Sequence, residues 1–334
     1  MKLLTLEQAK ELMTSYRILL VRDGAFPLLN LDLGLEYAEF DQFSVNPEFE
    51  EMVVGTKKFI EESCDFLVAV GGGSTLDVAK GIKYLLERDI PLLAMPTTAG
   101  TGSEATHFAV AYRKGQKESL AHPTLVPNYV VLESNFLKTL PIYQRRCTFL
   151  DALCQGIESL WSKKRTQESA GYAKEAIYLL MANAEAYLSE NSLCDDSVYE
   201  KIMYGAHLAG KAINLTTTTA PHAMSYQLTK KYGIPHGHAV ALCLPHCWEQ
   251  MGGQAEIAQL LGYETSSEAI QFLKRFLTAQ NIVPPAQAVY EDIDYLVESV
   301  NVKRLSNHPV TLMETELHLL YQKVLNTSSD TLKV

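Results

Sequence analysis

The chain has 334 residues, which is long for one ordinary hydrophobic core and fits two domains of usual size. Its composition, 47% hydrophobic and 20% charged, is that of a folded globular protein and not of a disordered one. The formal net charge of -10 argues against nucleic acid as the main partner, because phosphate contacts need a basic surface.

The cysteines and the N-terminus indicate a cytoplasmic protein. Six cysteines are scattered along the chain without a CxxC pair, which predicts buried, reduced thiols rather than a disulfide framework. The first residues, MKLLTLEQAKELM, soon carry Glu7, Lys10 and Glu11, so they predict the start of an amphipathic helix and not a signal peptide. No run of about eighteen apolar residues occurs, so no membrane span is expected.

As far as Pro141, short apolar runs alternate with helical patterns. Four runs are continuously apolar, as is typical of strands covered on both faces: Ile18–Val21, Phe66–Val70, Pro91–Met95 and Tyr129–Leu132. Helical spacing lies between them, over Pro47–Ser63 and Thr75–Glu87. This alternation predicts an α/β domain with a doubly wound parallel sheet.

After Pro141, strand-like runs almost vanish and long helical patterns take over. The range Gln167–Leu188, for example, carries apolar residues at three- and four-residue steps, which is typical of a helix packed on a core. We therefore expect two domains, an α/β domain over residues 1–141 and an all-helical domain over residues 142–334.

The run FLVAVGGGSTLDVAK places a buried strand, three glycines, a serine and a helix in succession. Gly71, Gly72 and Gly73 let the backbone turn sharply and approach a ligand without a Cβ in the way. The helix that follows offers unpaired N–H groups to a pyrophosphate. The run contains neither a Walker A loop nor GxGxxG. By itself it is either a phosphate-binding loop or a tight turn in which Ser74 only caps the helix.

The segment PTTAGTGSE follows the next predicted strand and resembles the first loop in kind. It holds two glycines and four hydroxyl side chains: Thr97, Thr98, Thr101 and Ser103. Because α/β sheets bind ligands at the carboxyl ends of their strands, two such loops on successive strands predict a dinucleotide cradle.

Four residues of the helical region have side chains that suit a metal ion. Asp151 and Gln155 are four apart, which places them on one helix face. His222 and His236 are fourteen apart, and each follows a proline. Imidazole and carboxylate ligands together suit zinc or ferrous iron, so these residues predict a metal site.

The order and spacing of GGGSxxDxxK and PTTAGTGSE resemble those of the iron-containing (group III) alcohol dehydrogenase family, and Asn46-Pro47 and Lys117 also fit that pattern. The resemblance implies a dehydroquinate synthase-like architecture, in which a dinucleotide-binding α/β domain precedes an all-helical metal-binding domain. It also implies NAD or NADP as the cofactor, iron or zinc as a divalent metal, and a homodimer.

The same resemblance implies roles around the dinucleotide. Gly71, Gly72, Gly73 and Ser74 would hold the pyrophosphate, with Asn46 beside the cofactor. The side chains expected to line the ribose and the nicotinamide are Asp77, Thr97, Thr98, Thr101 and Ser103. Lys117 is expected near the reacting end of the cofactor, as a binding and catalytic residue, although a loop lysine taken alone is usually only solvated.

The family holds its metal on an Asp, a His four residues later, and two further His fourteen residues apart. Asp151, His222 and His236 match this pattern, whereas Gln155 replaces the second ligand. An amide oxygen is a weaker and harder donor than imidazole. The resemblance therefore implies where the site lies, and it leaves open both the identity of the metal and whether Gln155 binds it.

Tyr226 stands four residues after His222, where many family members carry a His proposed to relay a proton. Tyr226 is therefore either a proton donor or an aromatic wall of the pocket. Cys154 is expected in the core, because its helix position turns it about 100° from its neighbour Gln155. We expect His238 to be structural or to support the metal ligands.

The implied reaction is NAD(P)H-linked reduction of a small aldehyde beside a metal that acts as Lewis acid. Within the family, APHAMSYQLT, YGIPHGHAVAL and NVKRLSNHP resemble the phosphonoacetaldehyde reductases, which make 2-hydroxyethylphosphonate. A phosphonate needs basic or hydroxyl groups around it, and Arg145, Arg146 and Lys117 are candidates.

Two other functions and one choice of cofactor stay open. The related dehydroquinate synthase and glycerol dehydrogenase branch shares the cradle and the metal position, although PTTAGTGSE and PHG favour the alcohol dehydrogenase branch. A degenerate nucleotide-binding protein with a weakened metal site is the non-enzymatic alternative. An acidic residue after the second strand would select NAD over NADP, and Asp41 is either that residue or part of a loop.

Overall fold

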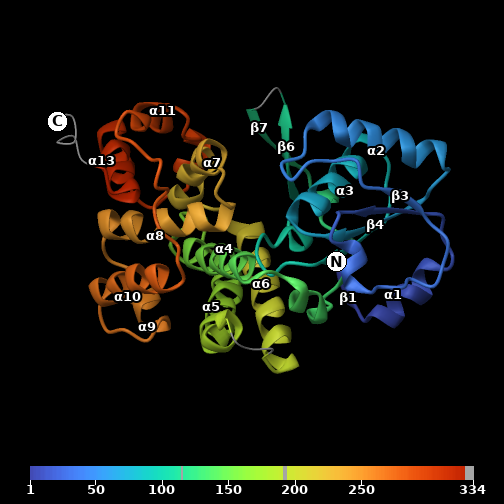
Figure 1. The fold of residues 1–334 in the computed structure, drawn as a ribbon, viewed down its shortest axis with the longest axis horizontal. Coiled ribbons are helices and arrows are strands. Elements are labelled where there is room, and N and C mark those ends of the chain that lie inside the picture. Colours follow the sequence, from blue (N-terminus) through green and yellow to red (C-terminus); the bar gives the residue numbers. More distant parts are fainter. Residues whose placement is uncertain (114–115, 191–193, 328–334) are drawn as a thin grey trace.

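The computed structural model describes residues 1–113, 116–190 and 194–327. Figure 1 shows an elongated molecule with a sheet-containing part at the N-terminal end and a purely helical part at the other. Within the described residues, six strands form one parallel sheet in the order β1-β8-β5-β4-β2-β3. Their bounds are β1 (Lys2–Leu4), β2 (Ile18–Arg22), β3 (Ala38–Phe40), β4 (Phe66–Gly71), β5 (Leu92–Pro96) and β8 (Tyr129–Val131). The predicted parallel sheet is confirmed.

The four central strands were predictable because both of their faces are buried. In β4, Leu67 and Ala69 pack into the core under the helices α2 (Phe49–Glu61) and α3 (Gly73–Leu85). Their neighbours Val68 and Val70 pack into the core on the opposite face, which is covered by α1 (Leu6–Met13). A strand buried on both faces must be apolar at every position, which is the pattern that identifies it.

Four strands carry no such signal and were not predicted. Residues Lys2–Leu4, expected at the start of a helix, instead form the edge strand β1, which pairs with β8. The strand β3 is equally short and lies at the other edge. An antiparallel hairpin of β6 (Phe108–Arg113) and β7 (Gln116–Ala121) lies outside the main sheet. These strands are defined by their pairing partners, and such pairing is hard to recognise from a short local sequence.

After Pro141 the described residues contain helices and no strands, and Figure 1 shows them packed together beside the sheet. The helices are α4 (Ile142–Trp161), α5 (Gln167–Leu188), α6 (Asp196–Thr216), α7 (Ala220–Tyr232), α8 (His236–Met251), α9 (Ala255–Leu260), α10 (Ser266–Ala279), α11 (Asp292–Glu298), α12 (Val302–Leu305) and α13 (Glu314–Leu325). One continuous apolar core joins them. None of the described helices has the length and apolarity to cross a membrane.

The cysteines are free, as the sequence predicts, but Cys194 is only half-buried. The other five are buried. Cys154 lies in the core of the helical part, and burial raises the pKa of its thiol well above the usual value. We give it no chemical role, because a protonated buried thiol is a poor nucleophile.

The register of the sheet fixes which loops meet at its carboxyl edge. Gly71 at the end of β4 is the partner of Pro96 at the end of β5, so the two predicted loops leave the sheet side by side. On the other side of β4, Arg22 pairs with Val70, so the residue after β2 also lies at the glycine loop. The fold thus gathers three chain segments at one edge.

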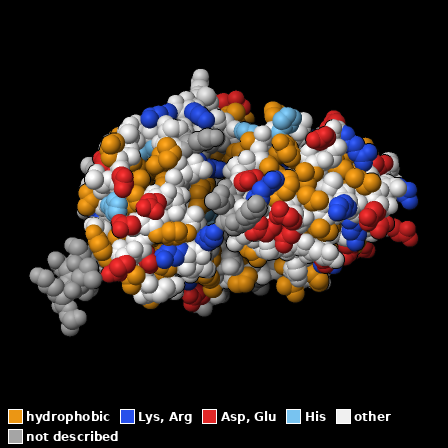
Figure 2. Space-filling view, turned by 90° about the horizontal axis from the view of Figure 1, so that it is seen from above, with side chains coloured by type: hydrophobic (Ala, Val, Ile, Leu, Met, Phe, Trp, Pro, Cys, Tyr) orange, Lys and Arg blue, Asp and Glu red, His pale blue; other side chains and the backbone are white. Residues whose placement is uncertain are grey.

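The second loop also joins the sheet to the helical part. Gly102, in the left-handed conformation with φ 61°, lies against Gly210 of α6, where a Cβ on Gly102 would be 2.4 Å from the Gly210 Cα. Glu104 Oε1 lies 3.1 Å from Nδ1 of His207, and both side chains are buried. Figure 2, a view from above, shows two lobes with a hollow between them. The loop at the sheet edge therefore packs directly against the helical part.

Candidate metal and cofactor site

The structure brings the two glycine-rich loops into contact. A Cβ on Gly72 would lie 3.5 Å from Cγ2 of Thr98, and one on Gly73 would lie 2.7 Å from Cγ2 of Thr101. Gly73 begins α3, whose first backbone N–H groups are the ones that a phosphate group can accept from. The predicted juxtaposition of glycines and hydroxyl groups at the sheet edge is therefore present.

Asn46 lies beside the same loop. The Ser74 hydroxyl donates a hydrogen bond to the carbonyl of Val45, and the Asn46 side chain is exposed. The Asn46-Pro47 segment thus forms one side of the glycine loop, where the resemblance places it.

Two of the predicted cofactor residues are bonded to each other behind the loop. Ser103 Oγ donates to Asp77 Oδ1 over 2.7 Å, and Thr97 N donates to the carbonyl of Gly71 over 3.0 Å. Lys80 donates to Ser103 Oγ over 3.0 Å from a fully buried ammonium group. Burial lowers the pKa of Lys80 to about 8. Lys80 belongs to GGGSxxDxxK, but the sequence does not indicate that it ties the two loops together.

An acidic side chain that we did not single out lies at the glycine loop. Asp23 follows β2, and its Oδ2 accepts from the backbone N–H of Gly72 at 3.4 Å and from Oγ1 of Thr75 at 3.2 Å. Asp41, the candidate considered from the sequence, is exposed beyond the edge strand β3 and pairs with Arg22 at 3.3 Å. The acidic residue next to the glycine loop is thus Asp23.

Lys117 is the one predicted cofactor and catalytic residue that cannot be placed. Its backbone pairs with Tyr112 in the β6–β7 hairpin, and its side chain lies outside the described part of the structure.

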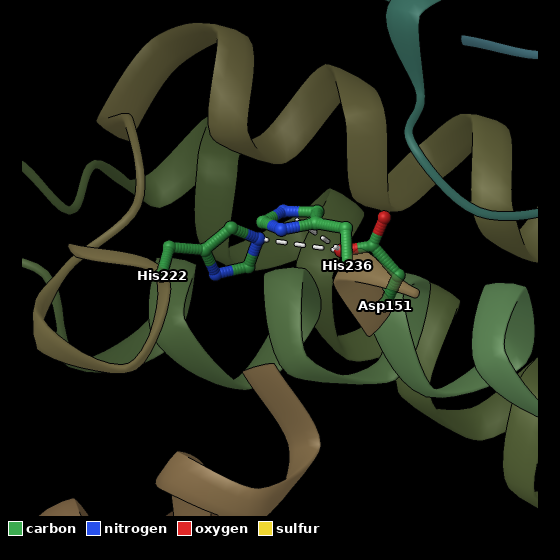
Figure 3. A group of neighbouring side chains, drawn as sticks. All are labelled: Asp151, His222 and His236. Carbon is green, nitrogen blue, oxygen red and sulfur yellow. Dashed lines mark ion pairs between the residues drawn. The ribbon is translucent and has the colours of Figure 1, made fainter. Parts of the chain in front are cut away.

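Three predicted metal ligands converge from three helices (Figure 3). Asp151 projects from the middle of α4, His222 from the first turn of α7, and His236 from the first residue of α8. Asp151 Oδ1 is 3.3 Å from His222 Nε2 and 4.0 Å from His236 Nε2, and the three ligand atoms lie within 4.8 Å of one another. Ligand atoms that lie this close together can bind a single cation.

The polar atoms around this point fit a cation. Asp151 Oδ1, Gln155 Oε1 and His222 Nε2 are all buried and make no hydrogen bond, although the first and the last of them lie 3.3 Å apart. Buried acceptors without partners are rare in proteins, and a bound ion accounts for them. Gln155 Nε2 donates to the carbonyl of Thr101 over 3.3 Å, which leaves its Oε1 as the free atom. The chain thus offers two oxygen and two nitrogen atoms as possible metal ligands, and Gln155 also contacts the loop that carries Thr101.

Glu158 orients His222. One oxygen of this fully buried carboxylate accepts from His222 Nδ1, and the other accepts from the Thr219 backbone N–H and hydroxyl, both at 2.8 Å. With its proton on Nδ1, the neutral imidazole of His222 would present the lone pair of Nε2 to a cation. Burial alone would lower the pKa of His222, but Glu158 and Asp151 outweigh it and raise the pKa to about 9. The pocket therefore favours a positive charge. Glu158 stands in the same helix motif as Asp151, but its part follows only from the fold.

Tyr226 lies against the third ligand. Its ring stacks on that of His236 with centroids 5.6 Å apart and planes 8° apart. Burial raises the pKa of the Tyr226 phenol. His238, in contrast, bonds to the Tyr143 hydroxyl at 2.8 Å and to the Val283 carbonyl at 2.9 Å, so it joins helices as a structural residue.

Comparison with known proteins shows what the whole chain is similar to. The family profile described as iron-containing alcohol dehydrogenase matches residues 5–134, and the C-terminal profile of the Fe-containing alcohol dehydrogenase family matches residues 146–325. A phosphonoacetaldehyde reductase of Streptomyces viridochromogenes is 30% identical over 288 residues, which cover 73% of this chain and 72% of the relative.

Two solved structures share the fold over nearly the whole chain. A sulfoacetaldehyde reductase from Bifidobacterium kashiwanohense, in complex with NAD+, is 24% identical with a TM-score of 0.88, and the match covers 98% of this chain and 97% of the other. An iron-containing alcohol dehydrogenase from Thermotoga maritima is 25% identical with a TM-score of 0.83, covering 96% and 95%.

Proposed function

Because the chain belongs to the iron-containing alcohol dehydrogenase family, we propose that it reduces a small aldehyde to the alcohol, using NADH or NADPH and a bound divalent metal. The observation that carries this proposal is a group of buried atoms that could bind a metal and make no hydrogen bond. They belong to Asp151, Gln155 and His222, next to the two glycine-rich loops. The family makes the chain an NAD(P)-dependent oxidoreductase.

We propose that the dinucleotide and the metal are bound by two different domains. Residues 1–141 would bind the dinucleotide, with its pyrophosphate over Gly71, Gly72, Gly73 and Ser74 at the start of α3. Residues 142–334 would hold the metal. Asp77 and Ser103, which are bonded to each other, would act by shaping the loop that carries Thr98 and Thr101. We also propose the homodimer that the family resemblance implies.

The chain's own residues suit the reaction. Asp151, His222 and His236 would hold the metal, and Gln155 Oε1 would be the fourth donor. When bound, the metal supplies a Lewis acid for the carbonyl oxygen, on which negative charge grows as hydride arrives. Tyr226 is protonated at neutral pH, as any tyrosine with an ordinary or raised pKa is, and its ring stacks on the proposed ligand His236. We propose that Tyr226 donates this proton to the alcohol oxygen, beyond serving as a wall beside His236.

Phosphonoacetaldehyde is the substrate we propose. The support is the 30% identity to a phosphonoacetaldehyde reductase, together with the resemblance of the segments around Tyr226 and Asn307 to such enzymes. A short-chain alcohol or polyol dehydrogenase is the second candidate, because a 1,3-propanediol dehydrogenase of Klebsiella pneumoniae is 31% identical over 233 residues.

The direct test is cofactor oxidation by the purified protein, loaded with ferrous iron or zinc and then treated with a chelator. We expect oxidation of NADH or NADPH with phosphonoacetaldehyde, abolished by the chelator. Turnover of propanal alone would keep the enzyme class and remove the phosphonate substrate. No turnover of any aldehyde with either metal, despite tight dinucleotide binding, would favour a degenerate nucleotide-binding protein.

Replacing Gln155 by His is expected to raise metal affinity about tenfold or more, because imidazole is the better ligand for zinc and ferrous iron. Metal titration followed by calorimetry measures the change. Gln144→His, at an exposed position of the same helix, is the matched control and should leave the affinity unchanged. A fall in affinity for Gln155→His would mean that Gln155 is no ligand.

Replacing Asp23 by Gly is expected to shift the enzyme from NADH toward NADPH. A carboxylate beside the strand that bears the glycine loop binds ribose hydroxyls and repels a 2′-phosphate. Removing that repulsion should change the ratio of kcat/KM for the two cofactors by on the order of tenfold or more. Asp41→Gly, beyond the edge strand, is the control. A shift with Asp41→Gly and none with Asp23→Gly would reverse the assignment.

A further inference from the structure

Arg304 is a cation beside the candidate site; it lies in the segment NVKRLSNHP but is not among the basic residues considered for the phosphonate from the sequence. Its short helix α12 is fixed from both sides. On one side, the Asn301 side chain accepts from the Arg304 backbone N–H at 3.2 Å.

On the other side, the Asn307 amide donates to the carbonyls of Thr216 at 2.8 Å and Thr218 at 3.1 Å. Ser162 of α4 in turn donates to Asn307 Oδ1 over 2.9 Å. These bonds fasten the segment 301–309 to the loop that leads into α7 and its metal ligand His222.

The guanidinium of Arg304 is directed toward Thr218 and Tyr226, which lie near the proposed metal ligands. Its Nη1 donates to Thr218 Oγ1 over 2.7 Å, and its central carbon lies 5.4 Å from the ring centroid of Tyr226. Tyr226 is the ring that stacks on His236. The positive charge therefore lies one aromatic ring away from a metal ligand.

Among the described residues this charge has no carboxylate partner, whereas the charges of several other arginines do. Arg22 pairs with Glu39 at 2.7 Å, Arg146 with Glu190 at 2.9 Å and Arg165 with Glu256 at 2.7 Å. Throughout the described residues, no carboxylate forms an ion pair with Arg304, although the side chain is only partly exposed. A half-buried guanidinium without a counter-ion, in a protein of net charge -10, is suited to an anion that arrives from outside.

The arginines considered from the sequence are not available for that task. Arg145 is buried and donates to the backbone carbonyls of Leu140 at 3.1 Å and Lys138 at 3.4 Å. Arg146 is held by Glu190. Both bond to groups away from the metal ligands, which leaves Arg304 as the arginine that reaches Tyr226.

We propose that Arg304, positioned by Thr218, is the specificity residue that binds the anionic group of the substrate, so that the enzyme prefers short aldehydes bearing a tetrahedral oxyanion. This inference rests on the proposed aldehyde reductase function. The planar guanidinium retains donors that are not used by Thr218, and these can bind phosphonate or sulfonate oxygens in pairs. Such binding would hold the aldehyde carbon near the metal ligands and the cofactor loop.

The test compares phosphonoacetaldehyde, sulfoacetaldehyde and propanal as substrates of the metal-loaded protein and of Arg304→Gln. We expect kcat/KM for the anionic aldehydes, relative to that for propanal, to fall roughly 100-fold in the variant, as is typical when a hydrogen bond to a charged group is lost. Arg304→Lys keeps the charge without the planar fork and should lie between the two. The exposed Arg275→Gln is the matched control and should leave the ratio unchanged.

A binding measurement separates recognition from turnover. Calorimetric titration of the protein with 2-hydroxyethylphosphonate in the presence of NAD should show weaker binding for Arg304→Gln and equal binding for Arg275→Gln. An unchanged ratio in Arg304→Gln, with the anionic aldehydes still preferred, would overturn the role of Arg304 and keep the proposed function. A wild-type preference for propanal over the anionic aldehydes would overturn the substrate class. If the wild-type protein reduced none of the three aldehydes, the proposed function itself would be contradicted. Loss of folding in Arg304→Gln would leave Arg304→Lys as the deciding variant.

Discussion

His236→Ala is expected to reduce aldehyde turnover by about 10³-fold or more while dinucleotide binding stays largely intact. His236 contributes one of three side chains whose donor atoms lie within 4.8 Å of one another, and its removal leaves Asp151 and His222 to hold the cation. The loss of a ligand weakens metal binding and with it the charge stabilisation of the reacting oxygen. The glycine loop that would bind the dinucleotide belongs to a different part of the chain, at the carboxyl edge of the sheet.

The measurement pairs turnover with two independent readouts, metal content and NADH binding by fluorescence. His318→Ala, at a partly exposed histidine of α13, is the control and should behave like the wild type. Persisting activity in His236→Ala would show that the metal site is assigned wrongly. Loss of both turnover and NADH binding would instead point to a general folding defect.

Gly237→Ala is expected to destabilise the protein and release its metal, although the substitution adds a single methyl group. Gly237 lies where α8 crosses α4, and a Cβ there would be 1.9 Å from the carbonyl oxygen of Cys147 and 3.1 Å from Cβ of Asp151. Backbone atoms cannot rotate away as a side chain can, so the helices must separate. Overpacking of this kind costs about 1–3 kcal/mol or more. The separation would also move His236 away from Asp151.

Thermal unfolding and metal titration test this prediction together. Gly171→Ala is the matched control, because Gly171 lies on α5 and a methyl group added there would meet nothing within 4 Å. There the exchange should stabilise the helix by up to about 1 kcal/mol. A Gly237→Ala protein with wild-type stability and metal affinity would show that α4 and α8 do not touch as the structure describes.

The strands and the ligand types could be read from the sequence because they depend on local patterns. β4 and β5 are apolar at successive positions because both faces of the sheet are covered, and each leads into a loop whose glycines and hydroxyl groups are themselves visible in the sequence. Asp151, His222 and His236 are residue types that a divalent metal prefers, and the family resemblance selects them from the other acidic and histidine residues of the chain.

Tertiary structure alone decided which of several similar residues lies at the site. Asp23 rather than Asp41 reaches the glycine loop because β2, and not β3, pairs with β4. Arg304 rather than Arg145 or Arg146 lies by Tyr226 because Asn307 fastens a distant segment to the loop before α7.

Tertiary structure also decided the part of Glu158. The sequence does not distinguish it from the other glutamates, and only the packing of α4 against α7 places its carboxylate at His222. Local sequence determines what each segment can form, since helix and strand patterns need only near neighbours. The choice of partner across the fold depends on sheet register and helix packing between segments far apart in the chain, and one sequence read by itself carries no pattern for those contacts.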